Sequence, residues 1–549
     1  MLKSVRVVAG GTALAVAAML AAGPAGAAWA GAGRRAGHPA GLMLRLNHPA
    51  PAVIRPRAAG AVPLKVPDPA AYAAQKAAAN AAAGRLAGRK SPSASAALAP
   101  ALLRNWAGQR DTTGAPSDST GAIGTARYIE LVNSRAAVYS RTSDTPTASG
   151  PLLALTGCAT QGCTDNVFDP QVIWDPGTKR FFYVADDIVS ASENLLDVGF
   201  STSATPTLSA GSWCRYRLNF GSTFPDYPKL GDTRDFQLIG VNEFNGTKFA
   251  GSRIAWVSKP PSGSACPGAQ TFKAGVTRTL KNANGTNAFT PVPGNQIDTG
   301  GTGWAVARPA SIPSTGATFL TLFKVTKSPT GAATIPTTGT AVPVSAFKIP
   351  ASAPQPGTSF TLDTLDARNT QAVLAADPAH GGVRALWTQH TVFGGAGAQV
   401  RWYEINPATH GLIQHGTVSN PSLFTFDAAV SPDRRVNGTS SMFGGDMVID
   451  VVQSSATVLP TIEAASKIGT GVISAPTTVA TSAAPDTGFD CAQSKTSLCR
   501  WGDYAAATPD PSSPTTGATG LVWGSSMLAA AGGSSTSAGW TTQNFEVRP

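Results

Sequence analysis

A strand–turn–strand unit with an aspartate at each end recurs along this chain and limits its fold more than any other feature. In "FDPQVIWDPGTKRFFYVA", Asp169 precedes an apolar run, and Asp175 opens an Asp-Pro-Gly turn before a second apolar run. Asp pairs separated by five residues occur at 169/175, 226/232 and 427/433, and a pair with one residue more occurs at 503/510. Such internal repetition is typical of folds built from one supersecondary element.

Seven segments align with this unit, and their alignment predicts the fold class. They begin at Asp118, Asp169, Asp226, Arg308, Asp366, Asp427 and Asp503. The 58 Gly and 42 Pro residues place turns at short intervals, with few helical patterns between them. We therefore predict an all-β protein, a β-propeller with seven blades, with six blades as the alternative.

The apolar pattern within one unit agrees with this prediction. Val172 and Trp174 lie on one face of the expected strand, and Ile173 lies on the other. A strand that is apolar on both faces suits the inner position of a propeller, between two neighbouring blades.

The N-terminal region has a different character and predicts export. Lys3 and Arg6 precede an apolar run, and small residues at 25–27 and 28–30 offer cleavage sites. We expect a signal peptide over 1–30, a disordered basic Ala/Pro-rich linker or pro-segment with one short helix over 31–110, and the propeller over 111–549. No later apolar run is long enough to predict a transmembrane anchor. We expect a monomer that is secreted, extracellular or periplasmic.

The charge is distributed unevenly and excludes one class of partner. The formal net charge is +11, but residues 1–110 contain all of the basic excess, and the remainder has slightly more acids than bases. A folded part without surplus basic charge argues against nucleic-acid binding. The basic arm is either a solvated linker or a tether to an anionic envelope or glycan surface.

Six cysteines in an exported chain predict disulfides rather than a catalytic thiol. Two short loops suggest Cys158–Cys163 and Cys491–Cys499, which leaves Cys214–Cys266. Serine-hydrolase, zinc-protease and phosphate-loop signatures are not found in the sequence.

Four motifs in order resemble a broad family of exported bacterial β-propeller proteins, most of which have no assigned function. They are "PSDSTGAIGTARYIELVNSRAAVYSR", "FDPQVIWDPGTKRFFYVA", "FPDYPKLGDTRDFQLIGVNEFN" and "RWGDYAAATPDP". More distantly, "TLSAGSW" and "SSTSAGW" look like sialidase Asp boxes that lack the Asp. The Asp169 segment also resembles the first blade of arabinanase- and xylosidase-type glycosidases, which implies that Asp169 is the general base.

Inner propeller strands all run in the same direction, so the residues at their starts should converge at one mouth. The candidate catalytic residues are Asp169, Asp226, Glu243 and Asp503. The candidate ligand-binding residues are Tyr227, Lys229, Arg308, Asp427, Arg500, Trp501 and Tyr504, with Arg368 as a further basic candidate.

Three roles for this ring of aspartates remain open at this point. Two carboxylates could divide the acid and base roles of glycoside hydrolysis. Several could coordinate a hard cation such as Ca²⁺. Each could instead cap its own loop by accepting backbone N–H bonds. The sequence therefore predicts a propeller that binds or processes glycans at an Asp-lined mouth. The alternative is a non-catalytic cell-surface propeller that binds protein or polysaccharide.

Overall fold

A computed structural model describes residues 44–46, 60–61, 64–86, 97–157, 167–268, 272–437, 440–515 and 517–549. All of these residues belong to one compact unit, Leu42–Pro549. The predicted signal peptide and the predicted Cys158–Cys163 pair lie outside the described residues. None of the helices described in these ranges has the length and apolar character that crossing a membrane requires.

Seven sheets of four or five strands make up most of the described chain. The first sheet contains β5 (Thr120–Ile123), β6 (Arg127–Val132), β7 (Arg135–Ser140) and β8 (Pro146–Pro151). The second contains β9 (Val167–Asp175), β10 (Arg180–Ser190), β11 (Glu193–Ser201), β12 (Trp213–Gly221) and β1 (Leu44–Leu46). The third contains β13 (Phe224–Asp232), β14 (Phe236–Asn245), β15 (Lys248–Ser258) and β16 (Ala274–Val276). The fourth contains β17 (Ala288–Pro293), β19 (Gly303–Pro309), β20 (Ala317–Lys327), β21 (Ala333–Thr334) and β22 (Thr340–Phe347).

The last three sheets follow the same order from first strand to last. The fifth contains β25 (Asn369–Asp377), β26 (Val383–Val392), β27 (Gln399–Asn406), β28 (Gly411–Val418) and β18 (Asn295–Gln296), which is parallel to β25. The sixth contains β29 (Phe424–Pro432), β32 (Met447–Ser454), β33 (Thr461–Lys467) and β34 (Thr477–Thr481). The seventh contains β36 (Ala506–Pro509), β37 (Val522–Ala529), β38 (Trp540–Arg548) and β3 (Ala101–Ala107).

The remaining elements are short, apart from one helix. They are α1 (Pro69–Ala83), α2 (Leu152–Thr156), α3 (Phe489–Gln493), the 3₁₀ turns η2 (Ala210–Ser212) and η3 (Pro378–His380), and the strands β2 (Gly60–Ala61), β4 (Gly114–Ala115), β23 (Ala353–Pro354), β24 (Thr361–Leu362), β30 (Arg435–Asn437), β31 (Ser440–Met442) and β35 (Leu498–Cys499).

The first strands of the seven sheets form a closed ring, which makes this unit a β-propeller and confirms the predicted all-β class. Contacts run from β5 through β9, β13, β17, β25 and β29 to β36, and β36 in turn contacts β5. Each sheet is therefore one blade, with its first strand next to the axis.

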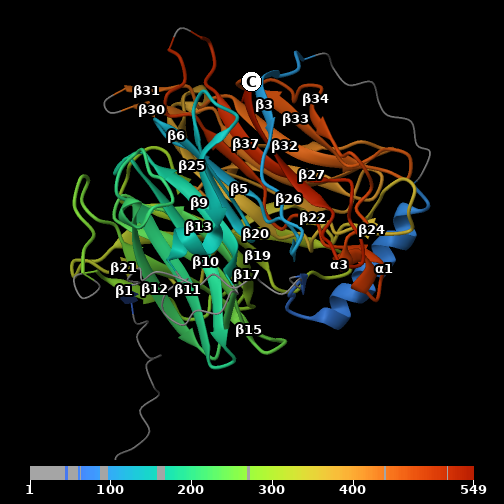
Figure 1. Ribbon diagram of the computed structural model, residues 1–549, viewed down its shortest axis with the longest axis horizontal. Coiled ribbons are helices and arrows are strands. Elements are labelled where there is room, and N and C mark those ends of the chain that lie inside the picture. Colours follow the sequence, from blue (N-terminus) through green and yellow to red (C-terminus); the bar gives the residue numbers. More distant parts are fainter. Residues whose placement is uncertain are drawn as a thin grey trace, which may run out of the picture. The chain divides into compact units, whose positions relative to one another are not determined.

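The last blade is completed by a strand from the other end of the chain. β3 pairs antiparallel with β38, with Leu102 opposite Val547, so the blue strand lies among the red strands in Figure 1. Residues 101–107, which lie within the predicted linker, form this outer strand. Burial alternates along β3, as expected for a half-exposed outer strand.

The second blade shows why these residues form inner strands. Every residue of β9 is buried. Trp174 packs with the side chains of the first blade, whereas Ile173 packs with Leu230 and Ile239 of the third. Burial between two sheets explains the apolar character of both faces. The turn after β9 is held by Asp175, whose Oδ1 accepts the Gly177 N–H at 3.0 Å and whose Oδ2 accepts the Thr178 hydroxyl at 2.6 Å.

The predicted unit that begins at Arg308 was aligned wrongly. Arg308 lies on β19, the second strand of its blade, and pairs with Phe289 of the inner strand β17. β17 has no aspartate at its start, so the repeat pattern did not reveal it. The structure therefore does not place Arg308 at the start of an inner strand.

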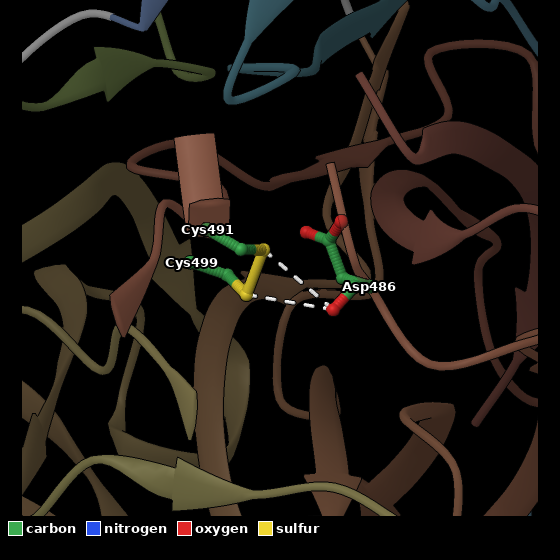
Figure 2. A group of neighbouring side chains, drawn as sticks. All are labelled: Asp486, Cys491 and Cys499. Carbon is green, nitrogen blue, oxygen red and sulfur yellow. Dashed lines mark hydrogen bonds between the residues drawn. A yellow bond between two sulfur atoms is a disulfide. The ribbon is translucent and has the colours of Figure 1, made fainter. Parts of the chain in front are cut away.

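The two predicted disulfides that lie within the described residues are confirmed. Cys214 in β12 joins Cys266 in the loop after β15, and Cys491 of α3 joins Cys499 of β35. Figure 2 shows both sulfur atoms of the second disulfide beside the Asp486 carbonyl oxygen, at 3.6 and 3.5 Å. Because Arg500 directly follows Cys499, this disulfide fixes the strand that leads into the mouth. The disulfides fit an oxidising compartment.

Candidate functional site

Five of the inner strands share a local irregularity near their starts. Near the starts of β9, β13, β17, β25 and β29 the pairing with the second strand shifts register, which marks a β-bulge. Asp169, Tyr227, Thr290 and Asp427 occupy these bulges with φ between 46° and 60°. Non-glycine residues rarely adopt such a conformation, so the fold holds these four side chains in a costly but defined direction.

This arrangement corrects the alignment of the third blade. Tyr227, not Asp226, is the residue equivalent to Asp169, and Asp226 lies one position earlier, opposite Asn242. The two candidates therefore enter the mouth from different backbone positions.

Four aspartates from the starts of four inner strands gather at the mouth and are nearly excluded from solvent. Asp118, Asp169, Asp226 and Asp503 are each at most 5% exposed. The Asp503 N–H donates to Asp118 Oδ1 at 3.1 Å, and the Asp169 N–H donates to Asn133 Oδ1 at 2.7 Å. Asn133 also donates to Asp118 Oδ2. The bond between Asp503 and Asp118 joins blades that are hundreds of residues apart in the sequence.

A lysine between two tyrosine rings occupies the centre of this group. Lys229 Nζ lies 3.3 Å from the ring centre of Tyr504 and 3.8 Å from that of Tyr227. The Tyr504 hydroxyl donates to Asp169 Oδ2 at 3.1 Å. Burial lowers the pKa of Lys229 well below its usual value, although Asp503 and Asp169 counteract the shift.

Burial and crowding raise the pKa values of the central acids. Burial, with the neighbouring charges of Asp226 and Asp503, raises the pKa of Asp169 to about 7. Burial also raises the pKa of Asp226 to about 7, while Arg368 and Lys65 oppose the shift. Oδ1 of Asp169 and Oδ1 of Asp503 have no nitrogen or hydroxyl donor among the described residues. The mouth therefore contains carboxyl groups that can exchange protons near neutral pH.

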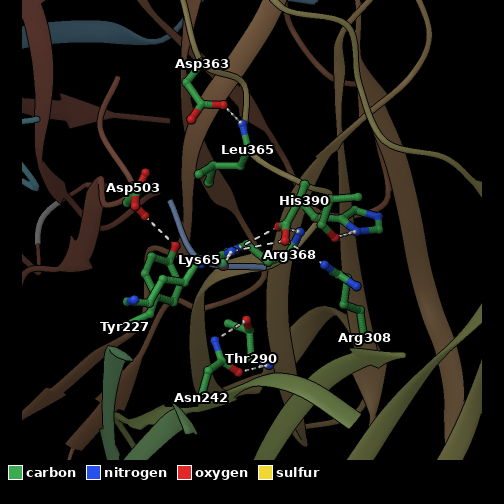
Figure 3. A network of polar contacts seen from close by, with 12 residues as sticks. Lys65, Tyr227, Asn242, Thr290, Arg308, Asp363, Leu365, Arg368, His390 and Asp503 are labelled. Carbon is green, nitrogen blue, oxygen red and sulfur yellow. Dashed lines mark hydrogen bonds and ion pairs between the residues drawn. The ribbon is translucent and has the colours of Figure 1, made fainter. Parts of the chain in front are cut away.

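The other side of the mouth is rich in arginine, and its charges are paired. Arg308 and Arg368 both donate to Asp366, at 2.7 Å each, and Arg500 donates to Asp503 Oδ2 at 2.6 Å. Figure 3 shows Arg368 beside Lys65, and Tyr227 bonded to the Asp503 backbone. Burial alone would raise the pKa of Asp366, but the two arginines hold it well below its usual range.

These residues do not fit the calcium site that was considered. The Lys229 amine is buried beside Asp503, Asp169 and Asp118, where it competes with a cation for the same carboxyl groups. A hard cation prefers a shell of oxygen ligands without a competing ammonium group.

The segment 64–86 lies over the mouth. Its Lys65 carbonyl oxygen accepts a hydrogen bond from Arg368 Nη2 at 2.8 Å. Helix α1 follows, with Asp68 as its N-cap, as the short helix predicted for this region. Its Lys76 is buried and donates to Thr364 Oγ1 at 2.7 Å and to the Leu365 carbonyl at 3.0 Å.

The contact between α1 and the propeller leaves space. A cavity of about 270 Å³ lies between α1 and the fourth and fifth blades, lined by Asp68, Tyr72, Arg308 and Asp366 among others. The helix buries only Lys76, Ala79 and Ala83. Small side chains and one lysine are a weak apolar anchor compared with the blade cores.

The remaining predicted site residues have different surroundings. Glu243 pairs with Arg253 of the neighbouring strand at 2.8 Å. Trp501 is 1% exposed and packs edge-on against Phe426, so its ring is not available as a platform for a ligand. Asp427 is buried, and the charges of Asp503 and Asp118 contribute to its raised pKa after burial itself. Arg308 reaches the mouth from the second strand.

Sequence reasoning missed several residues of this site. Asp118 began an aligned unit but was not selected, although its alignment with Asp169 was a usable signal. Asp186 of β10 also belongs here, because burial and the charges of Asp169 and Asp226 raise its pKa. Asp363, Tyr72 and Lys76 lie outside the repeat, and the sequence offers no signal for them.

Comparisons with known proteins reveal distant likenesses only. No family model and no curated protein matches the chain. Among solved structures, a Penicillium chrysogenum alpha-L-arabinanase complexed with arabinobiose has 11% identity and a TM-score of 0.34, over 64% of this chain and 94% of its own. The Dos1 propeller has 9% identity and a TM-score of 0.34, over 81% and 95%. An ACO/RPE65 chimera has 11% identity and a TM-score of 0.33, over 63% and 68%.

Proposed function

We propose that this chain is an exported propeller that hydrolyses a glycoside, with Asp169 and Asp226 as its acid–base pair. One observation carries the proposal: two buried carboxyl groups from adjacent inner strands have pKa values raised to about 7. Glycoside hydrolysis requires a proton donor and an ionised carboxylate on either side of the scissile bond.

The surroundings of the two acids assign their roles. Arg368 and Lys65 stabilise the ionised form of Asp226, whereas Asp169 faces Asp226 and Asp503 and accepts a single hydroxyl bond from Tyr504. Both pKa values are raised to about 7, so we assign the roles from the neighbouring charges: Asp226, beside two cations, as the ionised carboxylate, and Asp169, beside two acids, as the proton donor. This makes Asp169 the general acid, which reverses the base role that the resemblance to arabinanase- and xylosidase-type enzymes implied.

A substrate needs access to acids that are nearly excluded from solvent, so the segment 64–86 must move. We take this segment as the functional part of the predicted linker or pro-segment, a cover that Lys76 anchors over the mouth. Lys76→Ala removes the anchor, and Arg85→Ala removes an exposed charge of the same sign from the same segment. Hydrolysis should increase in Lys76→Ala and stay unchanged in Arg85→Ala.

The catalytic proposal is tested with a panel of chromogenic glycosides and a glycan array. Asp169→Asn and Asp226→Asn should each lower the hydrolysis rate by about 10²-fold or more, the usual contribution of a general acid or base. Asp144→Asn, at a carboxylate that is 60% exposed, is the matched control and should have full activity.

A second candidate is a non-catalytic glycan-binding propeller. The packing of Tyr227 and Tyr504 around Lys229 favours a non-catalytic role for the mouth, because buried rings and paired charges also stabilise the contacts between blades. Glycan binding without hydrolysis, retained in Asp169→Asn, would establish this candidate and rule out the enzyme.

A further inference from the structure

A second cluster of titratable side chains lies at the other end of the fifth blade, away from the mouth. β25 starts near the mouth at Asn369 and ends at Asp377, which caps the 3₁₀ turn η3 that contains His380. Glu404 lies on β27 of the same blade. One ligand atom from each of Asp377, His380 and Glu404 lies within 4.8 Å of the other two.

The two acids of this cluster are buried against each other. Asp377 and Glu404 are both 0% exposed, and their carboxyl groups are in hydrogen-bond contact. His380 Nδ1 contacts Asp377 Oδ2, and the Ala379 N–H donates to Asp377 Oδ1 at 2.7 Å. Two carboxylates in contact inside a protein require a proton or a cation between them.

Apart from the contact with Asp377, one oxygen of the Glu404 carboxyl group has no nitrogen or hydroxyl donor among the described residues. Its Oε2 accepts the Gln414 amide at 2.6 Å. The oxygen without a donor is Oε1, which is buried. The nearby Lys467 directs its ammonium group to the Gly469 carbonyl. A fully buried carboxylate oxygen without a nitrogen or hydroxyl donor, next to an imidazole and a second carboxylate, has the surroundings of a metal ligand.

We propose that Asp377, His380 and Glu404 bind a first-row divalent metal ion, with Zn²⁺ as the representative ion. One imidazole nitrogen and two carboxylate oxygens are ligands that Zn²⁺ accepts, and three protein ligands leave a position for water. Ca²⁺ and Mg²⁺ prefer shells of oxygen alone. The His380 side chain is 26% exposed and offers an entry path.

The other group with metal-ligand spacing does not share this property. Asp486, Cys491 and Cys499 lie close together, but the two cysteines form a disulfide and offer no thiolate (Figure 2). The inference about the fifth blade does not depend on the proposed glycosidase activity.

The test uses the full chain, stripped with a chelator and then titrated with Zn²⁺. Bound metal is measured by equilibrium dialysis with elemental analysis, and affinity by calorimetry. We expect one Zn²⁺ per chain that Ca²⁺ and Mg²⁺ do not displace. His380→Ala and Glu404→Gln should each weaken binding at least about tenfold, as the loss of a metal-site partner commonly does. His415→Ala is the matched control, because His415 is an exposed histidine on β28 of the same blade.

A thermal readout separates site loss from misfolding. Zn²⁺ should raise the melting temperature of the wild-type chain and of His415→Ala but not that of His380→Ala, while all three chains melt alike in chelator. Absence of stoichiometric Zn²⁺ binding would overturn the proposal. Stoichiometric binding that survives in both His380→Ala and Glu404→Gln would overturn it as well.

Discussion

Aspartates lie at both ends of the inner strands, but their hydrogen-bond partners differ between the two ends. At the end away from the mouth, Asp175 and Asp232 share Lys259, at 2.9 and 2.5 Å, and also accept backbone N–H bonds. At the mouth, Asp169 and Asp503 each have a buried oxygen without a nitrogen or hydroxyl donor among the described residues. An aspartate that only caps a turn satisfies both of its oxygens, so the unsatisfied end is where a function should be sought.

Replacing Lys259, the cation shared by Asp175 and Asp232, should cause the largest loss of stability. Lys259→Met leaves two buried carboxylates without their partner, and we expect the free energy of unfolding to fall by about 3–5 kcal/mol. Urea denaturation followed by tryptophan fluorescence measures this change. Lys327→Met, at a lysine whose side chain is 48% exposed, should cost less than about 1 kcal/mol. Equal losses of unfolding free energy in the two variants would show that the aspartates at this end of the strands do not depend on Lys259.

The pH dependence of stability tests the mouth. The folded protein keeps protons on Asp169 and Asp226 up to about pH 7, whereas an unperturbed carboxyl releases its proton near 3.8. The free energy of unfolding should therefore fall as the pH rises between these values, by about 1.4 kcal/mol per pH unit for each group. Asp169→Asn should reduce this fall.

Denaturant titrations at pH 5 and pH 8 measure the difference. The exposed Asp144→Asn is the control and should keep the wild-type pH dependence. The prediction is wrong if the free energy of unfolding rises from pH 5 to pH 8, or if Asp169→Asn leaves its pH dependence unchanged. Either result would show that the aspartates at the mouth do not have raised pKa values.

A substitution in the segment 64–86 should have a smaller effect on stability. Lys76→Ala removes two hydrogen bonds between α1 and the loop at 364–365, which we expect to cost about 1–2 kcal/mol of local stability. Hydrogen exchange of peptides from 69–83 should become faster, while exchange in the blade strands stays the same. Arg85→Ala should leave both unchanged, and uniform acceleration throughout the chain would instead indicate global destabilisation.

Glu243 should show the smallest effect. Its partner Arg253 is 24% exposed, so Glu243→Gln should cost at most about 1 kcal/mol. Hydrolysis or glycan binding should stay at the wild-type level in this variant. A loss of activity comparable with that of Asp169→Asn would return Glu243 to the catalytic set.

Local pattern was enough to predict much of the fold. Strands buried on both faces are largely apolar, and an aspartate (Asp175 or Asp433) marks the turn that follows, so the units at Asp169 and Asp427 could be located from residues alone. The disulfides Cys214–Cys266 and Cys491–Cys499 followed from the short loop of one pair and the elimination of the other cysteines. The helix that begins at Pro69 follows an Asp N-cap, another local signal.

The failures also have local causes. The inner strand β17 has no aspartate at its start, so the repeat was transferred to Arg308 on β19. A bulge shifts pairing by one residue without changing composition, so Tyr227 could not be distinguished from Asp226 as the counterpart of Asp169.

The sequence by itself determined the blade unit, because the alternation of buried strands and turns depends on near neighbours. It also placed Asp169 at the start of an inner strand. Only the tertiary structure decided what Asp169 faces. Closure of the ring brings Asp226, Asp503 and Tyr504 beside it, and Lys76 reaches Thr364 across 288 positions of the chain. Burial among like charges raises the pKa of Asp169, and that environment exists only when the distant blades meet.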